Sequence, residues 1–119
     1  MDLETLADML ETLTSRIPDA SQAPVFGVPG IIASDEIVTN TVTLFASATP
    51  ALTISCVPNV PGQVPITVAK LVSSLRDLLT NHPAAGRETP HIVYDGAKLA
   101  EVFSVGFAGG RVVLSAIPV

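Results

Sequence analysis

The sequence predicts an α+β protein, a tandem duplication of a helix-then-three-strand unit, with the helices packed on one face of an antiparallel sheet. Two amphipathic segments, residues 2–17 and 67–81, each carry apolar side chains three or four positions apart. A β-branched stretch follows each of them. The two halves also align with each other, which predicts an internal repeat.

The repeat is predicted to cover residues 2–58 and 67–118, with a linker at 59–66. Units of about 50 residues bury little surface alone, so both should share the core of a single domain, 1–119. Through the helices the offset is constant (71 − 6 = 65), and it pairs Leu6 with Leu71, Leu10 with Leu75 and Pro18 with Pro83. At the ends of the units the offset is 60 (115 − 55), which pairs Ser55 with Ser115 and Cys56 with Ala116.

Each predicted helix has a start signal and a stop signal. Asp2 and Thr67 are N-cap residues, because their short side-chain oxygens can accept a hydrogen bond from a free backbone N–H. Pro18 and Pro83 follow the helical pattern and should end it.

The predicted strands fall into two sets of three. Glycine-rich turns separate the last three, at Asp95–Gly96 and at Gly109–Gly110. Alternation and β-branched content place the strands at residues 24–27, 37–46, 52–57, 91–94, 99–107 and 111–117.

The second half resembles small uncharacterised accessory proteins of actinobacteria and their phages. The resemblance rests on Thr67–Val68 at a helix start, the strand 92–94, the Asp95–Gly96 turn and the closing strand 109–114, Gly-Gly-Arg-Val-Val-Leu. It covers about 50 residues made of common turn and strand signals. It implies only a small phage or bacterial accessory protein.

The composition favours a protein surface as partner. Charged residues make up 14% of the chain and mean hydropathy is +0.54, yet no apolar run is long enough to span a membrane. We therefore expect self-association or binding to another protein. The chain has little aromatic content and no basic stripe, so nucleic acid is not an expected partner.

The first residues and the cysteine content predict where the protein is located. The acidic start is not a signal peptide, and one cysteine fits a reducing compartment, so we expect a cytoplasmic protein, or a virion in a host cytoplasm, and not a secreted one.

The two halves of the chain differ in net charge. Residues 1–60 have seven acids and one base (−6), and residues 61–119 have four acids and five bases (+1). This asymmetry could align the two units or favour head-to-tail contacts between chains, but drift on a solvated surface is the simpler explanation.

The residues that could carry chemistry have simpler interpretations. Cys56 could be a nucleophile, but its counterpart is an alanine, which favours packing. His82 suits a helix C-terminus, and His91, aligned with Val25, should be structural. Asp95 is explained by its turn, and Glu101 should face solvent. No catalytic, cofactor-binding or metal-binding residue is predicted.

Three functions remain open. The first is a non-catalytic, homo-oligomeric assembly protein, and a structural component of a phage or other particle is one form it could take. The second is a small inhibitor or regulator of one host protein, and the third is an enzyme with a site between chains. For the first two, the expected interface lies on unpaired edge strands and on the acidic first helix, at Arg111, Val113, Leu52, Ile54, Asp8 and Glu11.

Overall fold

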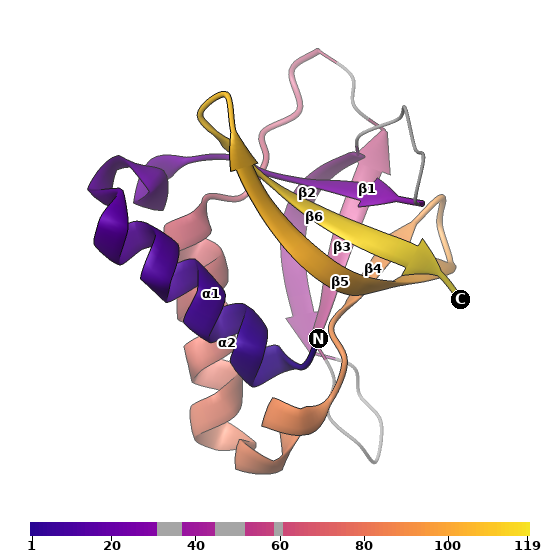
Figure 1. Ribbon diagram of the computed structural model, residues 1–119. Helices are drawn as coiled ribbons and strands as arrows, with labels where there is room; N and C mark the ends of the chain where they lie inside the picture. Colours follow the sequence, from indigo (N-terminus) through magenta and orange to yellow (C-terminus); the bar gives the residue numbers. More distant parts are fainter. Residues whose placement is uncertain (31–36, 45–51, 59–60) are drawn as a thin grey trace.

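The computed structural model describes residues 1–30, 37–44, 52–58 and 61–119, and within them the order helix-then-strands occurs twice. The chain is α+β, as predicted. Figure 1 shows two α-helices beside a curved sheet of six strands. The first set of elements is α1 (Leu3–Arg16), the 3-10 helix η1 (Pro18–Gln22), β1 (Val25–Pro29), β2 (Ile37–Leu44) and β3 (Leu52–Pro58). The second is α2 (Val68–Asn81), η2 (Pro83–Arg87), β4 (His91–Tyr94), β5 (Lys98–Ala108) and β6 (Arg111–Pro118).

The sheet is a closed mixed barrel, so the prediction of an antiparallel sheet was wrong. The strands follow one another around the barrel from β1 to β6. Neighbours within each set pair antiparallel, whereas β1 pairs with β6 and β3 with β4 in parallel. A sheet that closes on itself removes both free edges.

Closure also corrects the expectation of unpaired edge strands. β6 is paired on one side with β5 and on the other with β1, and β3 lies between β2 and β4. Each unit by itself would leave such an edge, and the other unit covers it. Neither β3 nor β6 therefore has a free edge that could pair with another subunit.

The two parallel pairings, the β1/β6 seam and the β3/β4 seam, are equivalent in the repeat. Exchanging the first unit for the second turns one seam into the other. In the β1/β6 seam Gly27 pairs with Leu114, and in the β3/β4 seam Ile92 pairs with Ile54. A barrel with two such equivalent seams has an approximate twofold relation between its halves. This register makes Gly27 the counterpart of Ile92 and corrects the predicted alignment of His91 with Val25.

The helix starts are as the sequence predicted. Asp2 Oδ1 accepts from the backbone N–H of Thr5 at 2.7 Å, and Thr67 Oγ1 accepts from that of Lys70 at 3.2 Å. Both helices end two residues before the expected proline, with one C-cap residue between, and each proline opens a 3-10 helix. The two helix-to-strand connections are therefore built alike.

The strand ladders carry one irregularity in each unit. The register of β2 against β3 shifts between Thr39 and Thr41, and that of β5 against β6 shifts between Val102 and Ser104. Such a bulge bends a strand and increases its twist, which a small barrel requires. Pairing beyond the bulge places Ser55 and Ser115 at the same ladder position. The predicted strand end at 45–46 and the start of the linker, 59–60, lie outside the described residues.

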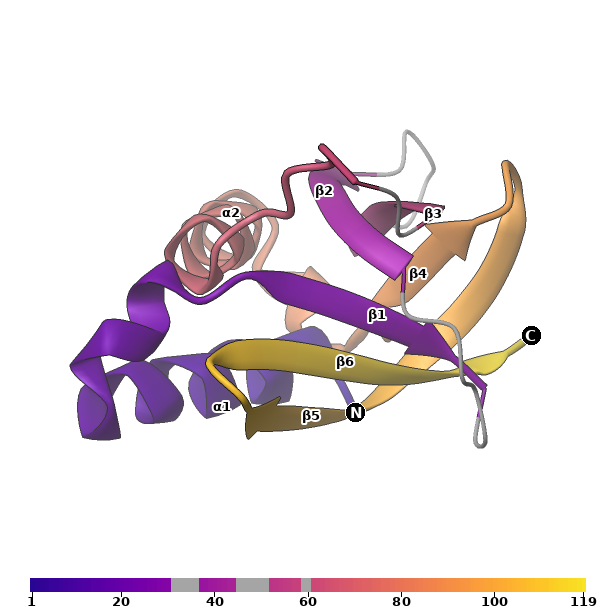
Figure 2. The same ribbon diagram turned by 90° about the horizontal axis from the view of Figure 1, so that it is seen from above.

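One core joins the barrel to the helices, which both lie against one side of it (Figures 1 and 2). The helices contribute a leucine-rich stripe and the strands contribute their inward-facing side chains. The largest fully buried side chains are Leu3, Leu6, Leu10, Val25, Val38, Ile54, Val68, Leu71, Leu75, Ile92 and Leu114.

Candidate functional site: a groove beside helix α1

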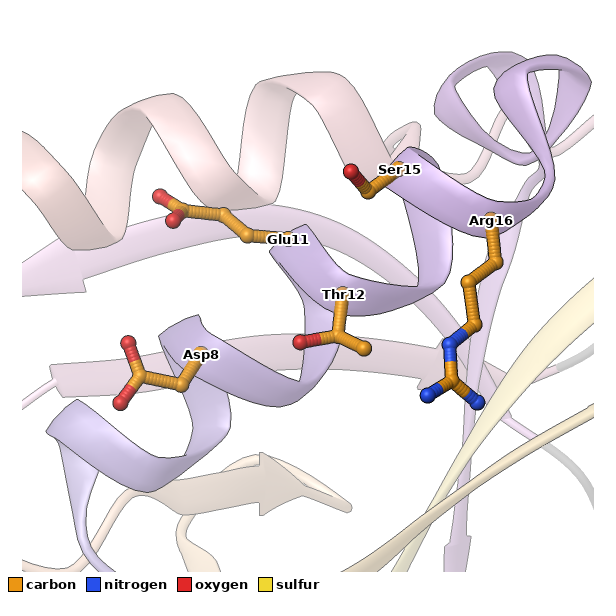
Figure 3. A pocket seen from close by; sticks show the side chains of 5 residues that line it. All are labelled: Asp8, Glu11, Thr12, Ser15 and Arg16. Atoms are coloured by element: carbon orange, nitrogen blue, oxygen red, sulfur yellow. The ribbon is translucent and has the colours of Figure 1, made fainter.

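A groove of about 500 Å³ lies between α1 and the end of the long strand β5. Its lining mixes apolar side chains with polar ones from successive turns of the helix. The lining residues are Thr5, Asp8, Met9, Thr12, Leu13, Arg16, Val105 and Phe107. A second hollow, of about 430 Å³, continues over the outer face of the same helix (Figure 3).

The local sequence explains why this groove is apolar at its base. The innermost stripe of α1 is fully buried, and Leu13, farther around the helix, is only partly covered. Met9 lies next to it and is 39% exposed. From β5, Val105 and Phe107 pack against the core at the same side, two positions apart as alternation requires. The groove thus exposes apolar surface that the chain itself does not cover.

An ion-pair cluster ties the outer face of α1 to α2. Arg76 donates from Nε to Glu11 Oε1 at 2.5 Å and from Nη2 to Glu11 Oε2 at 2.8 Å. Its Nη2 also bonds Asp8 Oδ1 at 3.0 Å. The planar guanidinium fork matches the two carboxylate oxygens, so this contact has directional strength as well as charge.

The cluster shifts the acidity of its members. The Arg76 hydrogen bond holds the pKa of the Glu11 carboxyl below its ordinary value of 4.5, and the same bond raises the pKa of Arg76. We did not predict this pair from the sequence. Its signal was present, however, because Arg76 and Glu11 are separated by 65, the offset of the repeat (76 − 11 = 65).

The expected interface residues have different positions in the structure. Asp8 and Glu11 line the hollow on α1, and Ile54 is fully buried in the core. Arg111 and Val113 are half-buried in the barrel wall, with the Arg111 guanidinium 5.5 Å from the Phe26 ring centre. The side chain of Leu52 lies outside the described part of the chain. Of the five residues whose side chains the structure describes, the two on α1 line the surface hollows beside that helix.

Cys56 has the environment of a packing residue. It is buried, its Sγ lies 3.6 Å from the carbonyl oxygen of Ile54, and burial raises the pKa of its thiol to about 12. A thiol with that pKa is protonated at neutral pH and is a poor nucleophile.

The histidines and nearby acids do not converge on one centre. His82 is the C-cap of α2, and its N–H donates to the carbonyl of Leu78 at 2.8 Å. His91 Nε2 lies 3.9 Å from Glu101 Oε1, while Asp95 pairs with Lys98 at 3.4 Å. His91 Nδ1 is buried without a hydrogen-bond partner among the described residues.

The described residues contain neither a metal-binding cluster nor a membrane-spanning helix. Within residues 1–30, 37–44, 52–58 and 61–119, no three His, Cys, Asp or Glu side chains are grouped closely enough to hold a metal ion. Over the same ranges, no helix has the length and apolar character needed to cross a membrane.

Comparison with known proteins returned no relative. No family model, no curated protein and no solved structure matches this chain.

Proposed function

We propose that this protein is a non-catalytic assembly module that binds other copies of itself through the groove beside α1. The observation that carries the proposal is the groove's composition: an apolar base of Met9, Leu13, Val105 and Phe107 with a polar rim. Contiguous apolar surface rimmed by polar side chains is typical of protein–protein contact sites.

The rest of the surface supports the same proposal. Only 17 of the 119 side chains are charged (6 + 11), and they are spread over a total accessible surface of 6347 Å². Several large apolar side chains remain well exposed outside the groove as well, among them Phe103 at 43% and Ile117 at 45%. Surface of this kind is more stable when another protein covers it.

We also propose that the chain arose by tandem duplication and folds as a single domain. The supporting observations are the repeated order of elements, the equivalent bulges and the two equivalent parallel seams. Because each unit supplies half of a closed barrel, neither could complete the sheet by itself. A role as a component of a larger particle in a cytoplasm would follow naturally from such a self-associating module.

Light scattering and sedimentation velocity on the purified protein test this proposal. A dimer or a larger closed assembly at micromolar concentration is the expected result. A 12.3 kDa monomer throughout the concentration range would contradict it. A monomer that captures one specific partner would instead favour the inhibitor or regulator, for which the acidic excess of the first half is the supporting observation.

A further inference from the structure

The outer face of α1 carries a row of three side chains, one per turn: Asp8, Thr12 and Arg16. Figure 3 shows them along the same side of the helix, whereas Glu11 points toward α2. With a rise of about 1.5 Å per residue, the acidic and basic ends lie about 6 Å on either side of Thr12 along the axis. The row is thus a short dipolar strip with a small, uncharged centre.

Such a strip is complementary to itself in the antiparallel direction. A twofold axis through Thr12, perpendicular to the helix, brings Asp8 of one copy opposite Arg16 of the other, and the reverse pair forms by symmetry. Contacts of this kind are isologous, so they close into a dimer without exposing a further binding face.

We propose that a second copy of this chain docks here, with the two α1 helices antiparallel and Thr12 at the twofold axis. The inference rests on the proposed function and specifies its contact surface. The apolar base of the groove supplies the affinity, while the two charge pairs set orientation and register.

Both charged groups can reach a partner. Asp8 accepts from Arg76 at Oδ1 and still has 65% of its side chain exposed. Arg16 is exposed, and within the described part of the chain it forms no ion pair. Arg16 is therefore not neutralised by its own chain, whereas Asp8 shares Arg76 with Glu11 and keeps most of its side chain exposed.

The equivalent face of α2 lacks this property. At the repeat offset of 65, the counterparts of the three strip residues are Ser73, Asp77 and Asn81. These have one negative charge and no positive one, so two copies of this face would place like charges together. The comparison favours α1 over α2 as the docking helix and supplies matched control positions.

Charge variants test the docking directly. Arg16→Glu leaves the strip acidic at both ends, and Asp8→Lys leaves it basic at both ends. We expect each variant alone to self-associate roughly tenfold or more weakly than the wild type in sedimentation velocity. An equimolar mixture of the two should recover association as a heterodimer, and the double variant Asp8→Lys/Arg16→Glu should recover the homodimer.

Recovery on mixing separates docking from folding. Asp8→Lys also removes the bond to Arg76, so circular dichroism must show that each variant is folded. A destabilised chain would not regain association by meeting a second altered chain. Arg16→Glu touches no described ion pair and gives an independent result if Asp8→Lys folds poorly.

A cross-link tests the position of the axis. Helices packed about 8–10 Å apart, with Cα atoms about 2.3 Å from each axis, bring facing Cα atoms to roughly 3–5 Å. A disulfide joins Cα atoms about 4.4–6.8 Å apart, so it can form at the wider end of that range. With copper phenanthroline and oxygen as oxidant, Thr12→Cys should form a covalent dimer, as two thiols lose two protons and two electrons. Asp77→Cys at the matched position of α2 is the control, and the buried Cys56 should not react.

The outcomes distinguish this inference from the proposed function. Wild-type association that persists unchanged in both charge variants, with no Thr12→Cys cross-link, would overturn docking through α1 and leave assembly through another surface. A wild type that stays monomeric would overturn the assembly function itself. Weakened single variants with recovery on mixing would support both.

Discussion

The two units share the order of their elements, and they differ at two contacts where they meet. At the contact between α1 and α2, one unit supplies Glu11 and the other supplies Arg76 at the equivalent position. Inside the barrel, one unit supplies Gly27 and the other Ile92. Each difference is complementary, in charge at the first contact and in size at the second.

The size difference has a direct steric reason. A Cβ added at Gly27 would lie 2.9 Å from Ile92 Cδ1, closer than real Cβ contacts. Isoleucine at both positions would overfill this part of the barrel, and glycine at both would leave a void. The same logic applies at the helix contact, where two glutamates or two arginines would repel. The comparison shows that the halves are specialised for each other.

The largest expected effect comes from breaking the size complementarity. Ile92→Ala removes most of a fully buried side chain and should lower the free energy of unfolding by about 2–5 kcal/mol. Gly27→Ala alone should cost up to about 1 kcal/mol through overpacking, because the close atom, Ile92 Cδ1, is the far end of a side chain that can shift. In the Ile92→Ala background the same Gly27→Ala change should cost less or stabilise, because the obstructing Cδ1 is gone.

Urea denaturation of this double-mutant cycle measures the coupling. If the changes in unfolding free energy at these two neighbouring positions were strictly additive, the fit between Gly27 and Ile92 would not contribute to stability.

Reversing the charge complementarity should have a smaller effect. Arg76→Glu places a third acid beside Asp8 and Glu11, and we expect a loss of about 1 kcal/mol, since these groups are partly exposed to solvent. The swap Glu11→Arg/Arg76→Glu should recover part of that loss. Thermal unfolding at low and high salt is the measurement, and the difference between Arg76→Glu and the swap should shrink at high salt. Equal stability of the two variants would contradict the role assigned to this pair.

The same ion pair should add a pH dependence to stability. The folded pKa of Glu11 lies below its ordinary value of 4.5, so its contribution is complete above that value and is lost as pH falls through the folded pKa. Arg76→Ala should therefore flatten the acid limb of stability against pH below about 4.5. Chemical denaturation at a series of pH values between 2 and 7 tests this. An unchanged acid limb in Arg76→Ala would show that the Glu11–Arg76 pair does not cause the pH dependence.

The smallest effect is expected at Cys56. The second unit has an alanine at this ladder position, so Cys56→Ala should reduce stability by less than about 1 kcal/mol and leave association unchanged. The wild-type thiol, with its pKa raised to about 12, should react slowly with iodoacetamide at pH 8 and quickly in urea. Loss of association in a folded Cys56→Ala protein would give the cysteine a role beyond packing.

The helices could be predicted almost completely because their signals are local. The N-caps Asp2 and Thr67 and the prolines Pro18 and Pro83 act within a few residues of where they stand. Most strand positions were also predictable from β-branched content, and the glycine pairs predicted the last hairpin, where Gly109 and Gly110 adopt positive φ angles of 62° and 74°.

The candidate site could be predicted only in part. The acidic positions Asp8 and Glu11 were expected at an interface, but the groove between α1 and β5 depends on how far the helix lies from the strand end carrying Phe107. The hydrophobic periodicity of these two segments does not indicate the distance between them. Ile54 was expected at a contact because its strand appeared to be an edge, and the parallel seam with β4 buries it instead.

By itself, the sequence determined the helix and strand positions and the offset of 65 that relates the helices, since these depend on neighbouring residues and on alignment. Closure of the sheet was decided only by tertiary structure. Pairing β1 with β6 and β3 with β4 joins segments more than 30 residues apart, and nothing local distinguishes a parallel partner from a free edge. Gly27 and Ile92 can be complementary in size only because closure of the barrel places them next to each other.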